Sequence, residues 1–203
     1  FCVRLSSHFF LLYRLYRSIY GGHGDWEARL VELIGVLLRK WRRRDDALRT
    51  LDHERETRPW YTEDGLVGYQ LYLDRFCGTL KALGKELDYF EELGVNMLHV
   101  MPITVSPREQ NDGGYAVSDY GAVQPQFGTI ADLRSLTEEM HKRKMVLVID
   151  YVVNHTSDEH EWAQRALAGE TEYIDFYHTF EDRTVPDIYE QTMPEVFPTN
   201  APG

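Results

Sequence analysis

Cysteine and long apolar runs are both scarce in this sequence, and their scarcity narrows its class. The 203 residues include 2 cysteines, too few to hold together a domain of this size by disulfides. No apolar run approaches the roughly 18 residues that a membrane span needs, and the apolar stretch 9–13 ends at Arg14. Hydrophobic residues make up 43% of the chain, an ordinary share for a globular protein. We predict a globular, cytoplasmic protein with no membrane partner, and we leave secretion open.

Positive charge is scarce after the first 60 residues. The chain carries 22 Lys and Arg against 33 Asp and Glu, a net charge of −11, and the acidic excess lies in residues 61–203. The basic run 39–44 could contact nucleic acid through its cations and Trp41. Alternatively, it is the solvated last turn of a helix, where cations suit the helix dipole. Asp45 and Asp46 follow at once and the rest of the chain would repel phosphate, so we predict no nucleic-acid partner.

The first 58 residues have the periodicity of helices. The pair Gly21-Gly22 separates an early helix from a second one. Apolar residues of the second helix recur at helical spacing and form one stripe: Leu30, Leu33, Ile34, Leu37, Leu38 and Trp41. We predict a partial, all-helical N-terminal domain over residues 1–60, whose stripes serve as core or as docking surface.

From residue 66 onward, apolar strands alternate with helices. We predict strands at 66–72, 95–101 and 145–149, with helices over 79–93 and 129–144 between them. This alternation indicates a parallel α/β fold. A doubly wound sheet would need a glycine-rich phosphate loop after its first strand, and residues 74–78 contain one glycine. Polar residues instead follow each strand, which favours a partial (β/α)8 TIM barrel, with its first three strands, over residues 61–152.

The predicted barrel is incomplete. A full (β/α)8 barrel takes roughly 250 residues, whereas residues 66–203 supply three strands. A helix over 159–168, ended by Gly169, and an aromatic, acidic stretch come after the third strand. We expect residues 153–203 to begin a domain inserted at this point. The chain opens at Phe1 and stops at Gly203 with no closing element, so we expect an N-terminal fragment of a longer protein.

A polar motif follows the third predicted strand. Asp150 ends the strand, and Asn154 and His155 come four and five residues later. Amide and imidazole groups at a barrel rim can donate hydrogen bonds to a polyhydroxylated ligand whose charge changes during a reaction. The same residues could instead cap the strand and form a turn. The spacing alone leaves both interpretations open.

A second motif, residues 111–115, follows the second predicted strand. Gly113 and Gly114 allow the backbone to turn sharply, after which Tyr115 offers a flat ring face. Such a face suits the C–H face of a sugar, and the Asp112 carboxylate can accept hydroxyl protons. The alternative interpretation is an ordinary Asp-Gly turn.

The remaining histidines do not indicate a metal site. His99 lies inside the second predicted strand, and we expect it to be a hydrogen-bonded core residue. Residues 159–162 lack the second histidine of a zinc-protease helix and predict a helix start. A later group of residues matches no zinc spacing: His155, Asp158, His160 and His178. We predict no metal and no cofactor.

Taken together, these motifs resemble the α-amylase family of glycoside hydrolases. Asp150, Asn154 and His155 after a third strand look like the first conserved region of that family. Gly114-Tyr115 with Asp119-Tyr120 resembles its segment after the second strand. Within the family the chain resembles the amylosucrases, from the helical start to Trp60 and in further segments: 101–102, 112–118, 154–157, 159–165, 176–177 and 195–198. The resemblance covers nearly the whole chain.

This resemblance implies a retaining glucosyl transfer. In amylosucrases sucrose is cleaved with release of fructose, and the glucosyl group passes through a covalent enzyme intermediate to an α-1,4-glucan or to water. Retention needs a nucleophilic carboxylate and an acid/base carboxyl, which in this family follow the fourth and fifth strands. Both would lie beyond residue 203, so the chain alone is expected to be inactive. Sucrose and an α-glucan acceptor are the expected partners, and the oligomeric state stays open.

The resemblance also implies roles for five residues. Asp112 matches an aspartate that pairs with a later arginine and closes the glucosyl pocket, and Tyr115 matches the aromatic platform under the glucosyl ring. His155 matches a catalytic histidine that hydrogen-bonds the glucosyl unit in its transition state. Asp150 is expected to brace an arginine structurally. Asn154 occupies a calcium-ligand position of many α-amylases, although amylosucrases are not known as calcium enzymes. The alternatives are a sucrose hydrolase, another α-glucosidase of the superfamily, or a non-catalytic relative.

Overall fold

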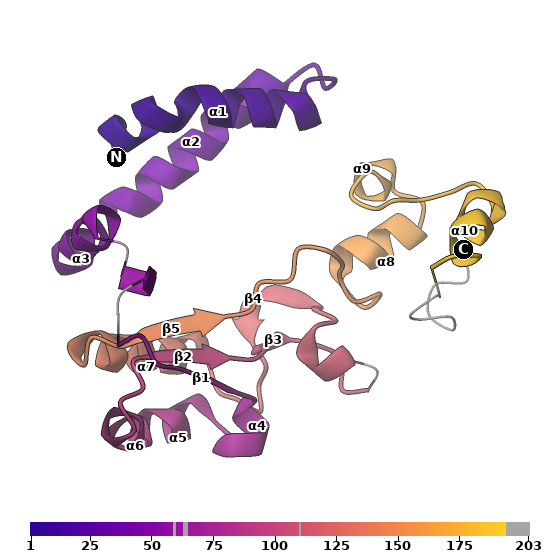
Figure 1. Cartoon of the computed structure of the whole chain (residues 1–203). Coiled ribbons are helices and arrows are strands. Elements are labelled where there is room, and N and C mark those ends of the chain that lie inside the picture. The colour runs from indigo at the N-terminus through magenta and orange to yellow at the C-terminus, as the bar shows by residue number, and fades with distance from the viewer. Residues whose placement is uncertain (59, 63–64, 110, 194–203) are drawn as a thin grey trace. The chain divides into compact units, whose positions relative to one another are not determined.

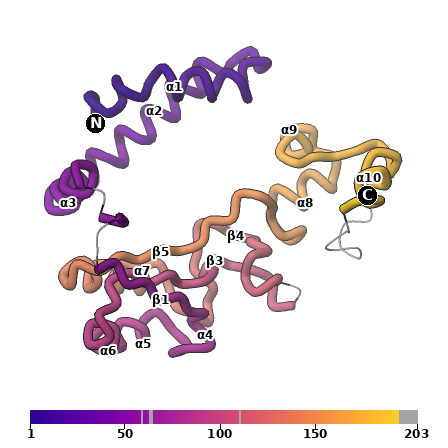
Figure 2. The backbone as a smooth tube through the Cα atoms, viewed as in Figure 1, coloured from indigo at the N-terminus to yellow at the C-terminus, as the bar shows by residue number. Residues whose placement is uncertain are grey.

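A computed structural model describes residues 1–58, 60–62, 65–109 and 111–193 of the chain (Figures 1 and 2). By their internal contacts the residues divide into two units, residues 1–64 and 65–203. The described part of the first unit is helical, and the strands lie in the second unit. The second unit therefore holds every motif for which a chemical role is expected.

Three α-helices make up most of the first unit: α1 (Cys2–Tyr20), α2 (Trp26–Arg42) and α3 (Asp46–Thr57), followed by the short 3-10 helix η1 (Trp60–Thr62). The predicted break is confirmed, because Gly21 caps the end of α1. The basic run 39–44 closes α2, and its Arg44 forms an ion pair with Asp52 of α3 at 2.5 Å. Of the apolar stripe on α2, Leu30 is buried, while Leu33, Leu37 and Trp41 are exposed.

A parallel sheet lies in the middle of the second unit (Figure 1). Strands β1 (Gly68–Leu71), β2 (Met97–Val100) and β5 (Val146–Ile149) lie side by side in that order. In register, Gln70 of β1 is paired with His99 of β2, and His99 with Val148 of β5. The structure confirms the prediction of three parallel strands joined through helices, the first part of a (β/α)8 barrel. The carboxyl ends of the three strands meet at one edge of this sheet.

Helices connect the three strands. α4 (Leu73–Phe76), α5 (Leu80–Lys85) and α6 (Leu87–Glu92) lead from β1 to β2, and α7 (Ile130–Lys142) leads to β5. The prediction of a single helix over 79–93 is wrong, because the helix divides at Glu86 into α5 and α6. Gly84 lies two residues before the division, and a glycine in a helix costs about 1 kcal/mol relative to alanine.

The alternation of side chains along β2 separates a core face from an open face. Leu98 and Val100 are 0% and 1% exposed and pack into the core between sheet and helices. Met97 and His99 therefore point to the opposite face of the sheet. The other core residues come from the strands, the helices and the loops after them: Leu71, Leu73, Leu80, Leu83, Leu87, Phe90, Val95, Ile103, Val123, Phe127, Leu136, Met140 and Met145.

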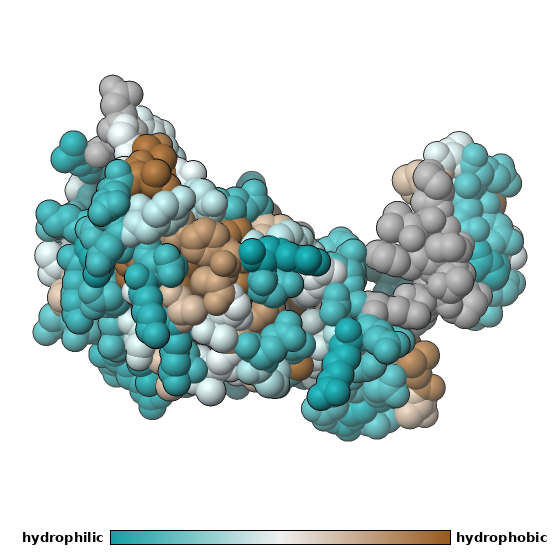
Figure 3. All heavy atoms as spheres, turned by 90° about the horizontal axis from the view of Figure 1, so that it is seen from below, coloured by the Kyte–Doolittle hydropathy of each residue, from teal (hydrophilic) through white to brown (hydrophobic). Residues whose placement is uncertain are grey.

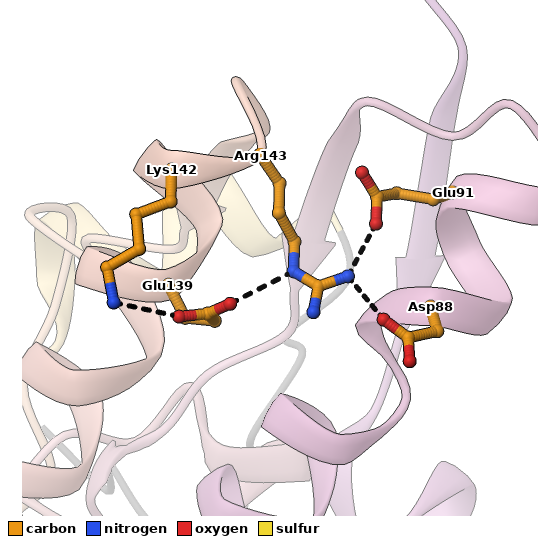
Figure 4. A network of polar contacts seen from close by, with 5 residues as sticks. All are labelled: Asp88, Glu91, Glu139, Lys142 and Arg143. Atoms are coloured by element: carbon orange, nitrogen blue, oxygen red, sulfur yellow. Dashed lines mark hydrogen bonds and ion pairs between the residues drawn. The ribbon is translucent and has the colours of Figure 1, made fainter.

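An ionic network connects α6 to the end of α7 (Figure 4). Nε of Arg143 donates to Glu139 at 3.2 Å, and one terminal guanidinium nitrogen lies 2.5 Å from both Asp88 and Glu91. Lys142 adds a further contact to Glu139 at 3.1 Å. The hydrogen bond to Asp88 and the other nearby carboxylates raise the pKa of Arg143. Because several charges share one network, it is more effective than an isolated surface pair in fixing one helix against the other.

A short antiparallel hairpin, which the sequence did not predict, interrupts the long stretch after β2. β3 (Thr104–Val105) pairs with β4 (Asp119–Val123), and the carbonyl of Val105 accepts the N–H of Ser118 at 2.8 Å. The hairpin closes residues 106–118 into a loop, and this loop contains the 3-10 helix η2 (Asp112–Gly114). The loop is thereby held at the edge of the sheet where the polar motifs lie.

Three short helices follow the sheet: α8 (Glu161–Leu167), α9 (Thr171–Ile174) and α10 (Thr184–Glu190). The predicted helix start is confirmed, because Nδ1 of His160 caps α8 by accepting the N–H of Trp162 at 3.1 Å. The assignment of residues 153–203 to an inserted domain, and of residues 1–60 to a separate one, stays a prediction. The segment 195–198, one of those that resemble amylosucrases, lies outside the described residues.

The face of the molecule shown in Figure 3 is largely hydrophilic, with apolar residues at the surface in places. Within the part of the chain that the structure describes, no helix has both the length and the apolar character needed to cross a bilayer.

Candidate active site

The centre of the candidate site is the carboxylate of Asp150, which directly follows β5. Its Oδ1 lies 3.1 Å from Nε2 of His99 on the neighbouring strand β2. Its Oδ2 accepts a hydrogen bond of 3.1 Å from the hydroxyl of Tyr115, in the loop closed by the hairpin. The side chains of His99 and Asp150 are 28% and 23% exposed. The structure thus brings together three groups from separate parts of the chain at the carboxyl edge of the sheet.

The Tyr115 hydroxyl is a donor under ordinary conditions. Burial, followed by the hydrogen bond and charge of Asp150, raises the pKa of Tyr115 to about 12. The phenol therefore keeps its proton at neutral pH and donates a hydrogen bond to the carboxylate. The hydroxyl also lies 3.8 Å from the sulfur of Met101, which in turn accepts a hydrogen bond from Gln70 of β1. These contacts fix the hydroxyl end of the ring.

The glycines of the second motif are required by the backbone. Gly113 and Gly114 have φ values of 67° and 95°, in the left-handed region that favours glycine. A Cβ on Gly114 would lie 3.1 Å from Cβ of Pro102, so the turn also needs the absence of a side chain. Asn111 closes the turn by accepting the N–H of Gly113 at 3.1 Å. The residues therefore form a tight turn that also delivers Tyr115 to the site.

Asp112 has a non-glycine φ of 50° at the start of this turn, and its side chain is exposed. The turn places Asp112 three residues from Tyr115 in the chain, outside the hydrogen-bonded cluster of His99, Asp150 and Tyr115. Its role in closing a glucosyl pocket with an arginine stays a prediction.

Asn154 and His155 lie further along the loop after β5, and both are exposed. The Asn154 amide nitrogen is 3.3 Å from Nδ1 of His155. The backbone of this loop is fixed by Tyr120, whose hydroxyl donates to the carbonyls of Val152 at 2.7 Å and His155 at 3.2 Å. Burial raises the pKa of Tyr120, which keeps this donor protonated. The loop after β5 thus places His155 at the surface, with its backbone fixed and its imidazole accessible.

His155 borders a hollow of about 810 Å³ that has aromatic walls. Trp162 and Phe176 stack in this wall, with ring centroids 4.6 Å apart, and the Tyr177 hydroxyl contacts Thr156 at 3.0 Å. Flat aromatic faces beside polar groups are typical of sites that hold sugar rings. A second hollow of about 460 Å³ lies beside Gly113 and Gly114. Its polar wall consists of Asp74, Arg75, Ser106, Asn111, Gln124 and Gln126.

The prediction for His99 is confirmed in one part and wrong in the other. The residue is hydrogen-bonded, to Asp150, as expected, but it lies on the face of β2 opposite the core. The period-two alternation of a strand contained this signal, because it places Leu98 and Val100 together on one face and His99 on the other. Among the described residues, no three His, Cys, Asp or Glu side chains are grouped closely enough to hold a metal ion. The absence of a metal from the functioning site stays a prediction.

A sequence model of the α-amylase catalytic domain matches residues 39–201, most of the chain. The chain belongs to the α-amylase family. This family membership agrees with the parallel strands and with the polar groups at their carboxyl ends. The prediction of a partial (β/α)8 barrel is confirmed by it.

Three relatives each match about 60% of this chain. The oligo-1,6-glucosidase of Parageobacillus thermoglucosidasius is 41% identical over 128 residues, which are 59% of this chain and 22% of that enzyme. The trehalose-6-phosphate hydrolase of Bacillus subtilis (strain 168) is 39% identical over 130 residues, or 60% of this chain and 22% of that enzyme. A crystal structure of a MutB mutant in complex with the substrate sucrose aligns with a TM-score of 0.53 and 36% identity.

The MutB alignment covers 59% of this chain and 22% of the other. This α-amylase-family chain therefore spans 22% of the length of each of these three relatives. Two of them are named as glucoside hydrolases. This agrees better with the α-glucosidase alternative than with the amylosucrase assignment.

Proposed function

We propose that this chain is part of a retaining enzyme that cleaves a short α-glucoside, with sucrose as the leading substrate. The observation that carries the proposal is the cluster of Tyr115, Asp150 and His99 at the carboxyl edge of an α-amylase-family sheet. Active sites of (β/α)8 barrels are built at this edge. The oligo-1,6-glucosidase and trehalose-6-phosphate hydrolase names, and the sucrose complex of MutB, support a short glucoside as substrate.

The proposed roles follow from the chemistry of the groups. Tyr115 supplies a ring face whose hydroxyl end is fixed by Asp150, and such a face can hold the C–H face of a glucosyl ring. His155 is an exposed donor beside an aromatic hollow and can hydrogen-bond the glucosyl hydroxyls. Asp112 closes the pocket with an arginine from a later part of the barrel. The nucleophile and the acid/base carboxyl that retention requires belong to the fourth and fifth barrel strands, outside this chain.

Transfer of the glucosyl group to an α-1,4-glucan, as in amylosucrases, is the second candidate. The observation in its favour is the run of matching segments in order, among them residues 159–165, which span the start of α8, and the helical first unit. Hydrolysis and transfer share the glucosyl-enzyme and differ in its acceptor, water or a glucan hydroxyl. The acceptor that receives the glucosyl group therefore distinguishes the two candidates.

The products from sucrose separate these two candidates. The complete protein that contains this chain is incubated with sucrose, and free glucose, fructose and glucan are measured. We expect equal glucose and fructose, the result for a hydrolase. Fructose in large excess over glucose, with an α-1,4-glucan formed, would instead favour the transferase. Absence of turnover of sucrose, isomaltose and trehalose 6-phosphate alike would contradict the proposed function.

A further inference from the structure

His99 is the residue of the site cluster whose role remains to be explained. It lies in the middle of the sheet, paired in register with Gln70 on one side and Val148 on the other. Its imidazole is on the face opposite the core, 28% exposed, and Nε2 contacts Asp150 at 3.1 Å. A carboxylate only accepts hydrogen bonds, so this contact requires the proton to lie on Nε2. Nε2 of His99 is therefore the nitrogen that carries a proton in this contact.

Two donors fix the Asp150 carboxylate, one on each oxygen. His99 Nε2 binds Oδ1 and the Tyr115 hydroxyl binds Oδ2, each at 3.1 Å. A carboxylate held by one bond can rotate about its terminal torsion, which is broad for Asp, whereas two bonds on opposite oxygens define its plane. The acceptor that fixes the Tyr115 hydroxyl is thus itself oriented by His99.

We propose that His99 is a positioning residue, which orients Asp150 and, through it, the ring of Tyr115 against the bound glucosyl unit. The inference deepens the proposed function and rests on it. The effect of His99 is indirect: its imidazole binds Asp150, Asp150 binds Tyr115, and the imidazole itself contacts no substrate. A displacement of about 1 Å in the groups that position a substrate can greatly lower the reaction rate. Loss of the His99 side chain should therefore lower turnover rather than prevent folding.

The test compares His99→Ala, His99→Gln and the control His141→Ala in the complete protein, on whichever α-glucoside the wild type cleaves. The Gln amide can place its N–H near the position of Nε2, and His141 is an exposed residue of α7 away from the site. We expect His99→Ala to lower kcat at least about tenfold with KM changed less than about threefold. His99→Gln should recover most of the rate, and His141→Ala should match the wild type.

A double-mutant cycle with Tyr115→Phe shows whether the effect passes through Tyr115. If it does, His99→Ala should cost little more in the Tyr115→Phe background, since coupled residues are not additive. Nitrogen NMR of labelled histidine should show a proton on Nε2 of His99, with the signal altered in Asp150→Asn. Simple additivity, unchanged kcat in His99→Ala, or an Nδ1–H tautomer would overturn the inference.

Failure of the inference and failure of the proposed function look different in these experiments. A wild-type protein that cleaves α-glucosides normally while His99→Ala keeps its kcat overturns the positioning role alone. A wild-type protein that cleaves none of the tested glucosides overturns the proposed function, and the positioning role with it. In that case the NMR spectra would still report whether His99 binds Asp150.

Discussion

At the scale of single residues, the candidate site is centred on a carboxylate with a hydrogen-bond partner on each oxygen. Asp150 accepts from His99 and from Tyr115, while the group expected to touch the glucosyl unit, His155, lies further along the loop. A hydrogen-bonded carboxylate at a strand end can hold two other side chains in place, because both of its oxygens are occupied by donors. The residue with the proposed catalytic role, His155, thus lies apart from this hydrogen-bonded cluster.

His155 carries the residue-scale prediction. In the complete protein, His155→Ala should lower kcat on sucrose by about a hundredfold, or on the order of 3 kcal/mol, since removing one transition-state donor typically costs this much. KM should change far less, because the bond strengthens as charge develops on the glucosyl ring. Steady-state kinetics of His155→Ala and of a control, the exposed His178→Ala, measure the difference. A kcat within about twofold of the wild type would exclude a transition-state contact.

The motifs of the site could be predicted from the sequence, but their contacts could not. Asp150 was expected at the end of the third predicted strand and Tyr115 in the segment after the second, because polar residues follow apolar strands in such a fold. Their hydrogen bond joins residues 35 positions apart, and its existence depends on the loop of residues 106–118 that the hairpin closes. The hydrogen bond between His99 and Asp150 joins residues 51 positions apart. Such contacts are set by three-dimensional packing, which periodicity within one element does not contain.

At the scale of elements, the long periodic segments were predictable and the short ones were not. The predictions of the three parallel strands and of α7 are confirmed. These elements were predictable because each has a strong apolar pattern. The hairpin of β3 and β4 was missed, since β3 has two residues and its pairing is shifted between Thr104 and Val105. The division at Glu86 was missed as well, because the buried residues Leu83, Leu87 and Phe90 keep a helical spacing across it.

The capping box at the start of α7, formed by Thr129 and Asp132, is the basis of a prediction about a single element. Thr129→Ala removes the side chain that accepts the N–H of Asp132 and should lower the free energy of unfolding by about 1 kcal/mol. The hydrogen bond from Thr129 lowers the pKa of Asp132, so this part of the stabilisation is present at neutral pH. It should be lost as the pH falls through that lowered pKa. Urea unfolding at neutral and acidic pH measures both effects.

The matched control for this cap is Ser135→Ala, an exposed position inside the same helix. Alanine has the better helix propensity, so stability should stay equal or rise slightly. If Thr129→Ala were as stable as Ser135→Ala at neutral pH, the cap would contribute nothing to the start of α7.

At the scale of the whole molecule, the sheet of the second unit is open along β5. Within the described residues, β5 is the last strand in the order β1, β2, β5, and its Val148 and Ile149 are 36% and 41% exposed. A (β/α)8 barrel closes such an edge with further strands, and the carboxyl ends of those strands complete the site. The chain spans 22% of the length of its relatives, so the remaining site groups are expected from the part of the protein outside it.

Asp112 connects the described loop to that remaining part. It is exposed here, at the start of a turn with a left-handed φ of 50°. We expect it to form an ion pair with an arginine of the later barrel and to close the pocket beyond the glucosyl unit. Such a wall would admit the glucosyl end of sucrose and exclude an internal unit of a long glucan. A protein with this wall should attack short donors from their ends.

The test is a double-mutant cycle in the complete protein, with Asp112→Asn and removal of the expected arginine. Asparagine keeps the tolerance for a left-handed backbone and removes the charge, so the change reports on the ion pair. We expect each single change to lower kcat/KM on sucrose and the double change to cost less than their sum, because paired charges are coupled by about 0.5–3 kcal/mol. Glu109→Gln, an exposed acidic residue of the same loop, is the control and should leave kcat/KM unchanged. Additive losses would mean that Asp112 and the arginine do not form a pair, and Asp112 would then have no part in closing the pocket.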